Sequence, residues 1–375
     1  MGSQTREVDV VVIGAGQAGL SSAYFLRRFG FAPGTGLVVL DADARPGGAW
    51  QHRPGSLTLS KVHGIFDLPG SHFRPTEADQ ARTAAAVVSD YYGAYERRYD
   101  LRVRRPVQVR SVRRADARLL VSASGTDGTP GEEWAARAVV NATGTWRRPY
   151  WPYYPGASDF AGRQLHYADY HGPAEFAGQR VVVVGGGLSA MQVLSEIADV
   201  AASTAWVTRR PPEFRDGEIN PDVGREVVAK VEERVRAGLP PASVVSVTGL
   251  AYTPVVLEAL RKGALDRLPM FDRIIADGVV WNDGRRVNAD VIIWATGFRA
   301  VIGHLAPLRL RESGGGIRMD GTRAVAEPRL HLVGYGPSAS TVGANRAGRA
   351  AAGEIRDLLA AEDESLQSER GARVG

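Results

Sequence analysis

The sequence contains no cysteine, although it is 375 residues long. This absence excludes disulfide bonds, thiolate metal ligands and, above all, a redox-active cysteine pair within the chain. Histidine is scarce as well, and none of the seven residues stands in an H-E-x-x-H or comparable metal-ligand spacing. We therefore expect neither a structural nor a catalytic metal ion.

Lysine is almost absent too, since only Lys61, Lys230 and Lys262 occur. The formal charge of +5 comes from arginines that are scattered along the chain, and no basic arm is present. This pattern favours a solvated surface with sites for phosphorylated ligands over binding to nucleic acid.

Long apolar runs are missing as well. No stretch of about 18 apolar residues, no secretory signal pattern and no lipidation motif is found. The chain is 44% hydrophobic and 23% charged, which is typical of a globular protein with a substantial core. We expect a cytoplasmic protein without membrane contact, built from two or three domains.

The most informative stretch is residues 8–19, VDVVVIGAGQAG. Apolar β-formers lead into a glycine-rich turn, and apolar residues at helical spacing follow it. In such a strand–turn–helix unit, Gly14 allows the turn, Gly16 lets a pyrophosphate approach the backbone, and Gly19 lets helix and strand pack closely. Free N–H groups and the positive end of the helix dipole then favour a phosphate at the turn.

A second predicted strand, at residues 37–40, ends in Asp41. A carboxylate at this place can accept a hydrogen bond from a ribose hydroxyl, so the unit predicts a site for FAD or NAD. In the following loop, RPGGAW at residues 45–50, Gly48 permits close approach of the backbone to a bound molecule. Trp50 follows at once, and we expect both residues at the cofactor.

The next part of the chain predicts a helix over residues 76–99 that starts with a capping box. A β-meander should follow, with its three strands around residues 103–112, 118–124 and 133–140. The meander ends just before a segment rich in proline and aromatic residues, 148–155, which favours a domain boundary there.

The opening motif returns at residues 180–190, RVVVVGGGLSA. Gly185 and Gly187 take the two leading glycine positions, and Ser189 stands at the start of the next helix. Ala190 replaces the third glycine, which the motif accepts because only small size is needed there. A second phosphate-binding turn is therefore predicted.

The strand after this second turn ends in Arg209 and Arg210, where the first unit ends in Asp41. A carboxylate suits a free ribose diol, whereas arginines suit a 2′-phosphate through charge-assisted hydrogen bonds. The first site should therefore hold FAD or NAD, and the second site NADPH.

A strand followed by Ala-Thr-Gly occurs twice, with Thr143-Gly144 after the meander and Thr296 after a later strand. We interpret the repeat as marking the two crossings between domains, and we expect Thr143, Gly144 and Thr296 at the cofactors. A last buried strand contains Gly334. Residues 338–341 then cap a final helix from about Val342 to Leu359, whose N-terminal N–H groups should point at the flavin pyrimidine. We expect Gly334 and Thr341 at the cofactor.

These elements predict an α/β fold with two Rossmann-type dinucleotide-binding domains, the second inserted in the first, together with a β-meander. The FAD-binding domain should comprise residues 1–147 and 299–360, and the NADPH-binding domain residues 148–298. The polar residues 361–375 are predicted to be a disordered tail.

The residues alone lead to an NADPH-dependent flavoprotein. Because a cysteine pair is missing, O₂ or another external acceptor remains as the destination of the electrons. The site chemistry does not choose between them.

A family resemblance adds to this reading. Residues 160–170, FAGRQLHYADY, match the F-x-G-x-x-x-H-x-x-x-[YFW] fingerprint of the class B flavoprotein monooxygenases. GGAW at residues 47–50 resembles their GG-x-W, and ATGF at residues 295–298 resembles their ATG-[YF]. The likeness spans residues 8–355 and is greatest to short bacterial members related to the flavin-containing and YUCCA-type enzymes.

The resemblance implies a monooxygenase that uses FAD, NADPH and O₂ to place one oxygen atom on a small organic substrate through a flavin C4a-hydroperoxide. Tyr170 at the end of the fingerprint favours N- or S-oxygenation. His166 of the fingerprint would act at the coupling of the two domains, and Ser60 and Lys61 stand where many relatives carry an asparagine near the flavin. We take these three as the catalytic candidates.

Other functions stay open at this point. A Baeyer–Villiger monooxygenase would use the same two sites, as would an oxidase or an electron transferase without oxygen transfer. A non-catalytic flavin-binding module is a further alternative, although it needs no second phosphate-binding turn. A homodimer is also open.

Overall fold

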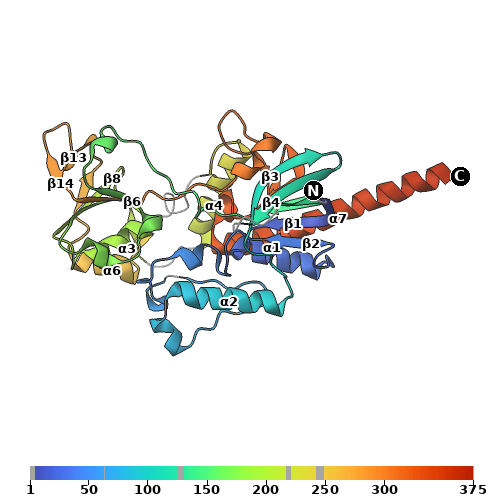
Figure 1. Cartoon of the computed structure of the whole chain (residues 1–375), viewed down its shortest axis with the longest axis horizontal. Coiled ribbons are helices and arrows are strands. Elements are labelled where there is room, and N and C mark those ends of the chain that lie inside the picture. Colours follow the sequence, from blue (N-terminus) through green and yellow to red (C-terminus); the bar gives the residue numbers. More distant parts are fainter. Residues whose placement is uncertain (1–4, 63, 126–130, 217–220, 242–248, 375) are drawn as a thin grey trace.

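The protein is described by a computed structural model that covers residues 5–62, 64–125, 131–216, 221–241 and 249–374. The chain forms two lobes that lie side by side, each built on a sheet with parallel strands at its centre (Figure 1). Most of the loop expected between the second and third meander strands lies outside the described residues.

The first lobe contains both ends of the chain (Figure 1). Its four central strands are parallel and follow the spatial order β2 (Leu37–Leu40), β1 (Thr5–Ile13), β5 (Glu132–Asn141) and β18 (Glu327–Leu332). The meander joins β5 through the antiparallel strands β3 (Val107–Ala115) and β4 (Arg118–Gly125). The far edge is a small hairpin of β16 (Met319–Asp320) and β17 (Arg323–Ala324).

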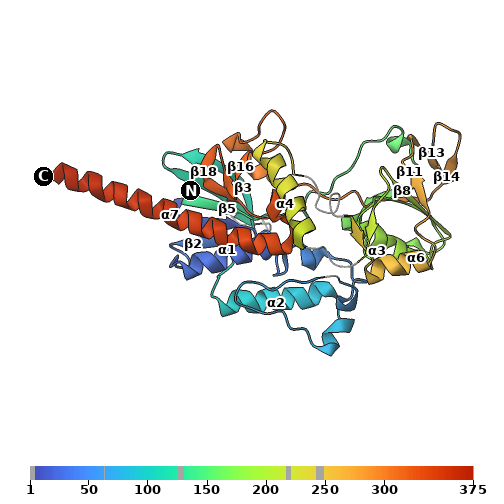
Figure 2. The same cartoon turned by 180° about the vertical axis from the view of Figure 1, so that it is seen from behind.

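The helices of this lobe are α1 (Gln17–Arg28), α2 (Ala84–Arg98) and α7 (Thr341–Val374). The apolar sides of α1 and α7 share one core with the buried valines of β1, because parallel strands must be covered on both faces. Figure 2 shows α7 running beside α1 and extending beyond the lobe.

The second lobe has five parallel strands in the order β11 (Arg267–Pro269), β8 (Ser203–Thr208), β7 (Arg180–Val184), β15 (Val291–Trp294) and β6 (Arg163–His166). Helices α3 (Leu188–Ile197) and α6 (Pro254–Arg261) pack on it. Two small sheets complete the lobe: β12 (Arg273–Ile275), β13 (Gly278–Val280) and β14 (Arg286–Asn288) in one, β9 (Phe214–Arg215) and β10 (Leu250–Ala251) in the other.

Short 3₁₀ turns connect these elements: η1 (Gly48–His52), η2 (Leu59–Lys61), η3 (Glu77–Ala81), η4 (Ala157–Asp159), η5 (Tyr167–Asp169), η6 (Pro173–Phe176), η7 (Gly303–Leu308) and η8 (Gly336–Ala339).

Strands β5 and β18 are neighbours in one sheet, while the whole second sheet lies between them in the sequence. This connectivity confirms the predicted α/β fold, with one Rossmann-type unit inserted in the other.

The helix predicted over residues 76–99 is divided in two. The capping box forms, since Asp79 accepts a hydrogen bond from the Thr76 N–H at 2.8 Å, but it caps only η3. The chain turns extended at Arg82, and α2 begins anew with Thr83, whose hydroxyl accepts from the Ala86 N–H.

One helix departs from the predicted division of the chain. Helix α4 (Pro221–Arg236) falls inside residues 148–298, yet it packs on the first lobe. Val235 is 2% exposed and belongs to the same core as Leu305 and Leu308. A Cβ on Gly336 would lie 2.9 Å from a Val235 methyl group, so α4 covers η8 directly.

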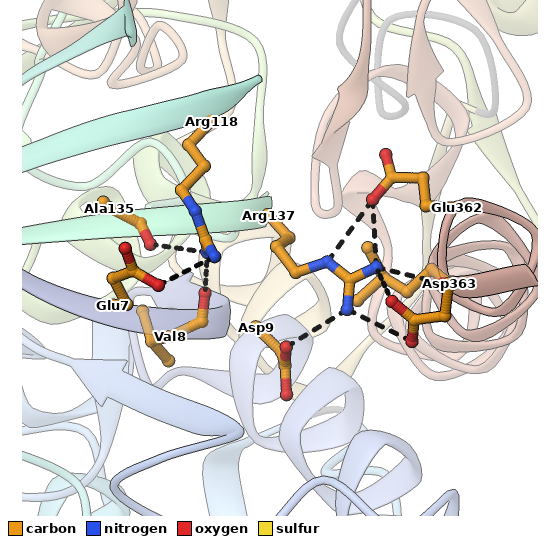
Figure 3. A network of polar contacts seen from close by, with 9 residues as sticks. Glu7, Val8, Asp9, Arg118, Ala135, Arg137, Glu362 and Asp363 are labelled. Carbon is orange, nitrogen blue, oxygen red and sulfur yellow. Dashed lines mark hydrogen bonds and ion pairs between the residues drawn. The ribbon is translucent and has the colours of Figure 1, made fainter. Parts of the chain in front are cut away.

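The tail predicted to be disordered at residues 361–375 is instead helical as far as it is described, because α7 continues to Val374. Three glutamates and two alanines in this segment favour helix. Arg137 of β5 also holds it in place. Its guanidinium donates to Asp363 at 2.7 Å, as Figure 3 shows, and to the Leu359 carbonyl at 3.0 Å. It also pairs with Glu362 and with Asp9 of β1.

We expect Arg137→Ala to lower the free energy of unfolding by about 1–3 kcal/mol, because charge-assisted bonds to α7 are lost. Denaturant unfolding followed by circular dichroism measures this. Arg113→Ala, which removes an exposed arginine of β3, is the matched control and should have little effect. Equal losses in both variants would show that Arg137 does not anchor the helix.

Two histidines of the first lobe, the buried His331 and the half-buried His304, make stability depend on pH. Burial lowers the pKa of His304 and of His331 to about 4, because the charged ring is poorly solvated. The unfolded chain takes up protons near pH 6.5 and the folded chain does not. Stability is therefore complete above about pH 6.5 and is lost as the pH falls towards 4.

Unfolding curves at a series of pH values should show this acid loss becoming shallower in His304→Gln, whose amide can still donate to Asn141 as the ring Nε2 does. A variant with the same pH dependence as the parent protein would refute the assignment.

Candidate active site

The first glycine-rich turn joins β1 to α1 and leaves no room for side chains at two positions. Gly14 has φ +98°, and a Cβ there would lie 2.5 Å from the Ala142 carbonyl oxygen. A Cβ on Gly19 would lie 1.8 Å from the Gly14 carbonyl oxygen. Both glycines are thus required for packing within the protein itself.

Gly16 has a different environment, since a Cβ there would meet only the Gly48 Cα, at 3.7 Å. The space beside Gly16 is open, and α1 starts behind it without a side-chain cap or an acidic residue in its first turn. The N–H groups of that turn are therefore available to an anion. The turn fits the pyrophosphate of a dinucleotide.

Asp41 lies at the end of β2, directly beside this turn. Its carboxylate is 6% exposed and accepts hydrogen bonds from the Ala15 N–H at 2.5 Å and the Asp43 N–H at 2.8 Å. Burial raises the pKa of Asp41, while the two N–H donors oppose the rise. A carboxylate has further lone pairs, so this one can also receive a ribose hydroxyl.

The GGAW loop folds over the same turn. A Cβ on Gly48, which has φ +52°, would lie 2.7 Å from the Gly16 Cα. Trp50 follows in η1 and packs against the core of the first lobe. Gly334, after β18, lies beside the start of α1, because a Cβ there would be 3.4 Å from the Cβ of Ala18.

Helix α7 starts at Thr341, one residue before the predicted Val342, and the Ser340 hydroxyl caps it by accepting from the Gly343 N–H at 3.1 Å. Its first turn is also tied to α1. Gln17 Nε2 donates to Asn345 Oδ1 at 2.9 Å, and the Tyr92 hydroxyl donates to Gln17.

The second glycine-rich turn repeats the geometry of the first. Gly185 has φ +146°, and a Cβ there would lie 2.3 Å from the Ala295 carbonyl oxygen. Around Gly187 nothing lies within 4 Å of a Cβ, and α3 starts behind it without a side-chain cap. This turn, too, fits a pyrophosphate, with Ser189 in the first turn of the helix.

Arg209 and Arg210 are exposed at the end of β8. Within the part of the chain that the structure describes, neither side chain makes a hydrogen bond or an ion pair. Arg209 lies near the Tyr154 hydroxyl, whose pKa is raised by burial and lowered by the nearby cation. Two uncommitted guanidinium groups therefore stand at the edge of the second nucleotide site.

The two crossings between the lobes pair with each other. We call these segments, residues 143–150 and 296–301, the hinge. Their backbones run antiparallel, with the hydrogen bonds Tyr150 N–H to Gly297 O at 2.9 Å, Arg299 N–H to Arg148 O at 2.8 Å and Val301 N–H to Gly144 O at 2.9 Å.

The threonines of the repeated Ala-Thr-Gly motif brace this hinge. Thr143 Oγ1 donates to the Val301 carbonyl at 2.6 Å, and Thr296 Oγ1 donates to the Tyr150 carbonyl at 2.5 Å. Trp146 stacks on Phe298 with ring centroids 4.7 Å apart. Contact of either threonine with a cofactor stays a prediction.

His166 is completely buried at the end of β6, next to the hinge. Its Nδ1 accepts from the Ala168 N–H and its Nε2 donates to the Gly297 carbonyl, both at 3.0 Å. Burial lowers the pKa of His166, so the ring is neutral and both nitrogens are occupied. These contacts join the fingerprint segment to the hinge.

Ser60 and Lys61 are exposed on η2, and their polar contacts stay within their own loop. Ser60 Oγ lies 3.0 Å from Thr58 Oγ1, and Lys61 Nζ donates weakly to the Ser56 carbonyl at 3.4 Å. A catalytic part for Ser60, Lys61 or His166 stays a prediction.

Sequence reasoning missed a polar contact surface between the lobes, which we call the seam. Glu196 of α3 is its centre: the carboxylate accepts from the Ser56 and Tyr170 hydroxyls, both at 2.7 Å, and from Gln192 Nε2 at 3.1 Å. The Tyr167 hydroxyl donates to Gln192 Oε1 at 2.7 Å. Only the tyrosines, which lie in the fingerprint, gave a sequence signal.

Among the described residues, no group of three or more histidine, aspartate and glutamate side chains is arranged to hold a metal ion. Nor does any described helix have the length and apolar character needed to cross a membrane.

Comparison with known proteins agrees with this geometry. The family described as pyridine nucleotide-disulphide oxidoreductase matches residues 11–248. A solved structure of a flavin-containing monooxygenase from Stenotrophomonas maltophilia is 39% identical, covers 95% of this chain and 100% of that chain, and has a TM-score of 0.78. The chain belongs to the class B flavoprotein monooxygenases.

Two curated relatives extend the likeness to this family. Indole-3-pyruvate monooxygenase YUCCA1 of rice, Oryza sativa subsp. japonica, is 27% identical, over 88% of this chain and 87% of its own length. An uncharacterized CzcO-like oxidoreductase of Geobacillus kaustophilus is 26% identical, over 78% of this chain and 80% of its own length. As a class B member the protein is an FAD-dependent monooxygenase, and without cysteine it cannot reduce disulfides through a thiol pair of its own.

Replacing Gly16 tests the first turn. Since Gly16 has ordinary backbone angles and open space, Gly16→Val should fold but purify without flavin, because the side chain takes the place of the pyrophosphate. Flavin content per chain, read from the visible spectrum, is the measurement. Gly55→Val, at an equally open glycine, should stay fully yellow. A yellow Gly16→Val protein would refute the site.

Proposed function

We propose that the protein is an NADPH-dependent monooxygenase that oxygenates the nitrogen or sulfur atom of a small organic molecule. The observation that carries this proposal is the pair of open glycine turns on either side of one hinge, the first beside Asp41 and the second beside two free arginines. Bound together, FAD and the nicotinamide coenzyme supply hydride transfer and the activation of O₂.

The preference for NADPH follows from charge. Arg209 and Arg210 stand at the strand end where the second ribose of a dinucleotide is held, and no carboxylate of the described chain neutralises them. A 2′-phosphate gains charge-assisted hydrogen bonds from such groups, whereas the 2′-hydroxyl of NADH gains little.

The chain's own residues bind and orient rather than exchange protons. His166 holds the hinge as a neutral ring, and Thr143 and Thr296 brace the crossings. We propose that these residues hold the two nucleotides in a fixed position relative to each other, and that the packed lobes exclude water from the reacting atoms.

N- or S-oxygenation is favoured by the end of the fingerprint. Tyr170 is 1% exposed, and its hydroxyl is committed to Glu196 of α3. A tyrosine in place of tryptophan at the end of the fingerprint supports N- or S-oxygenation in this proposal, and its bond to Glu196 ties the fingerprint to α3.

Double replacement of Arg209 and Arg210 by alanine should raise the KM for NADPH about 10- to 100-fold and leave the KM for NADH nearly unchanged, since only the 2′-phosphate loses charged partners. Flavin reduction assayed with both coenzymes measures the effect. Arg273→Ala, an exposed arginine of β12, is the control. An equal rise in the KM of both coenzymes would refute the assignment of Arg209 and Arg210 to the 2′-phosphate.

Oxygen transfer itself is tested with probe substrates under ¹⁸O₂. The enzyme, NADPH and either thioanisole, trimethylamine or cyclohexanone are incubated, and the products are analysed by mass spectrometry. We expect one labelled oxygen atom in the sulfoxide or the N-oxide. A labelled lactone alone would point to Baeyer–Villiger chemistry. Hydrogen peroxide in full yield from NADPH, with no labelled product, would leave an oxidase.

A further inference from the structure

Arg53 of the first lobe is a cation held at the junction of the lobes. It follows η1, three residues after Trp50. Its guanidinium carbon lies 4.8 Å from the ring centroid of Trp146 and 5.6 Å from that of Trp50. Contact with two tryptophan rings holds the direction of the side chain through cation–π attraction.

The guanidinium lacks a counter-ion. Its Nε is buried and has no hydrogen-bond partner, and within the described chain no carboxylate forms an ion pair with Arg53. Glu196, the carboxylate of the seam, is already satisfied by Ser56, Tyr170 and Gln192. A partly buried cation without a counter-ion costs stability, so the site favours an anionic ligand.

The charge faces the second nucleotide site. Trp146, on which Arg53 lies, contacts the ring of Tyr167 edge-on with centroids 6.3 Å apart, and the Tyr167 hydroxyl donates to Gln192 of α3. The charge of Arg53 also opposes the rise of the Tyr167 pKa that burial causes. Ser189 lies in the first turn of α3, two residues after Gly187, where the surroundings are open. Arg53 therefore stands between the GGAW loop and the N-terminal end of the coenzyme helix.

We propose that Arg53 binds, across the lobe junction, the pyrophosphate of the nicotinamide coenzyme held by the second turn. One lobe then contributes a charged group to the site of the other, and coenzyme binding draws the lobes together. This inference rests on the proposed function, because it places the coenzyme at the second turn.

The chemistry is simple ion recognition. The pyrophosphate carries two negative charges beside the first N–H groups of α3, and a guanidinium can form two parallel hydrogen bonds to phosphate oxygens.

Binding measurements on the oxidised, FAD-loaded enzyme test the proposal without turnover. The dissociation constant of NADP⁺ is measured by isothermal titration calorimetry for the parent protein, Arg53→Ala, Arg53→Gln and Arg53→Lys. We expect about 10- to 100-fold weaker binding in the alanine and glutamine variants. Arg53→Lys keeps the charge and should lie between. Arg74→Ala, an exposed arginine of the same lobe, is the matched control.

A second probe, adenosine 2′-monophosphate, has the 2′-phosphate but lacks the pyrophosphate. Its affinity should stay unchanged in every Arg53 variant and fall when Arg209 and Arg210 are replaced. If NADP⁺ binds the Arg53→Gln protein as tightly as the parent, the proposal is overturned. Equal weakening of both probes overturns it as well, because the defect then lies in the second lobe as a whole.

The two proposals can fail separately. If the parent enzyme does not bind NADP⁺ at all, the proposed function fails together with this inference. If the parent binds NADP⁺ tightly through Arg209 and Arg210, and the Arg53 variants bind it equally well, only the role of Arg53 is wrong. Flavin content and the unfolding curve of each variant confirm that it is folded.

Discussion

The pairing of the two hinge segments is the constraint on which the arrangement of the molecule depends. The chain enters the second lobe through residues 143–150 and returns through residues 296–301, and the two crossings hydrogen-bond to each other as one antiparallel ribbon. Thr143 and Thr296 brace it, and the stacked rings of Trp146 and Phe298 fill its side. Because both crossings share one ribbon, the lobes that carry the two glycine turns are joined through a single hydrogen-bonded connection.

This constraint explains why a buried, neutral histidine stands in the fingerprint. His166 links β6 to the hinge carbonyl of Gly297, and charging the ring would remove the acceptor that receives the Ala168 N–H. The seam adds a second tie, since Glu196 binds groups from both lobes. In the proposed function, the way in which the lobes are joined positions the two cofactors, and the side chains orient them and exclude water rather than exchange protons.

The sequence predicts those features that short segments determine. The glycines of both turns and Asp41 could be placed correctly, because a strand, a tight turn and a helix are local structures with strict steric demands. Helix α4 was assigned to the wrong lobe, since the partner of Val235 is set by long-range packing. The helical tail is held by Arg137, which is more than 200 residues away in the sequence. Arg53 becomes a candidate ligand-binding residue only once its neighbours across the lobe junction are known. Neither contact leaves a periodic pattern in the sequence.

In the proposed function, coenzyme held at the second turn passes a hydride directly to FAD held at the first. Stopped-flow spectroscopy under anaerobic conditions tests this most directly, by mixing the FAD-loaded enzyme with NADPH, with NADH and with NADPH deuterated at the transferred position. We expect the visible flavin absorbance to be lost. At low coenzyme concentration the loss should be faster with NADPH than with NADH, and deuterium at the transferred position should slow it. An unchanged flavin spectrum, or reduction that is insensitive to deuterium and equal for both coenzymes at every concentration, would contradict it.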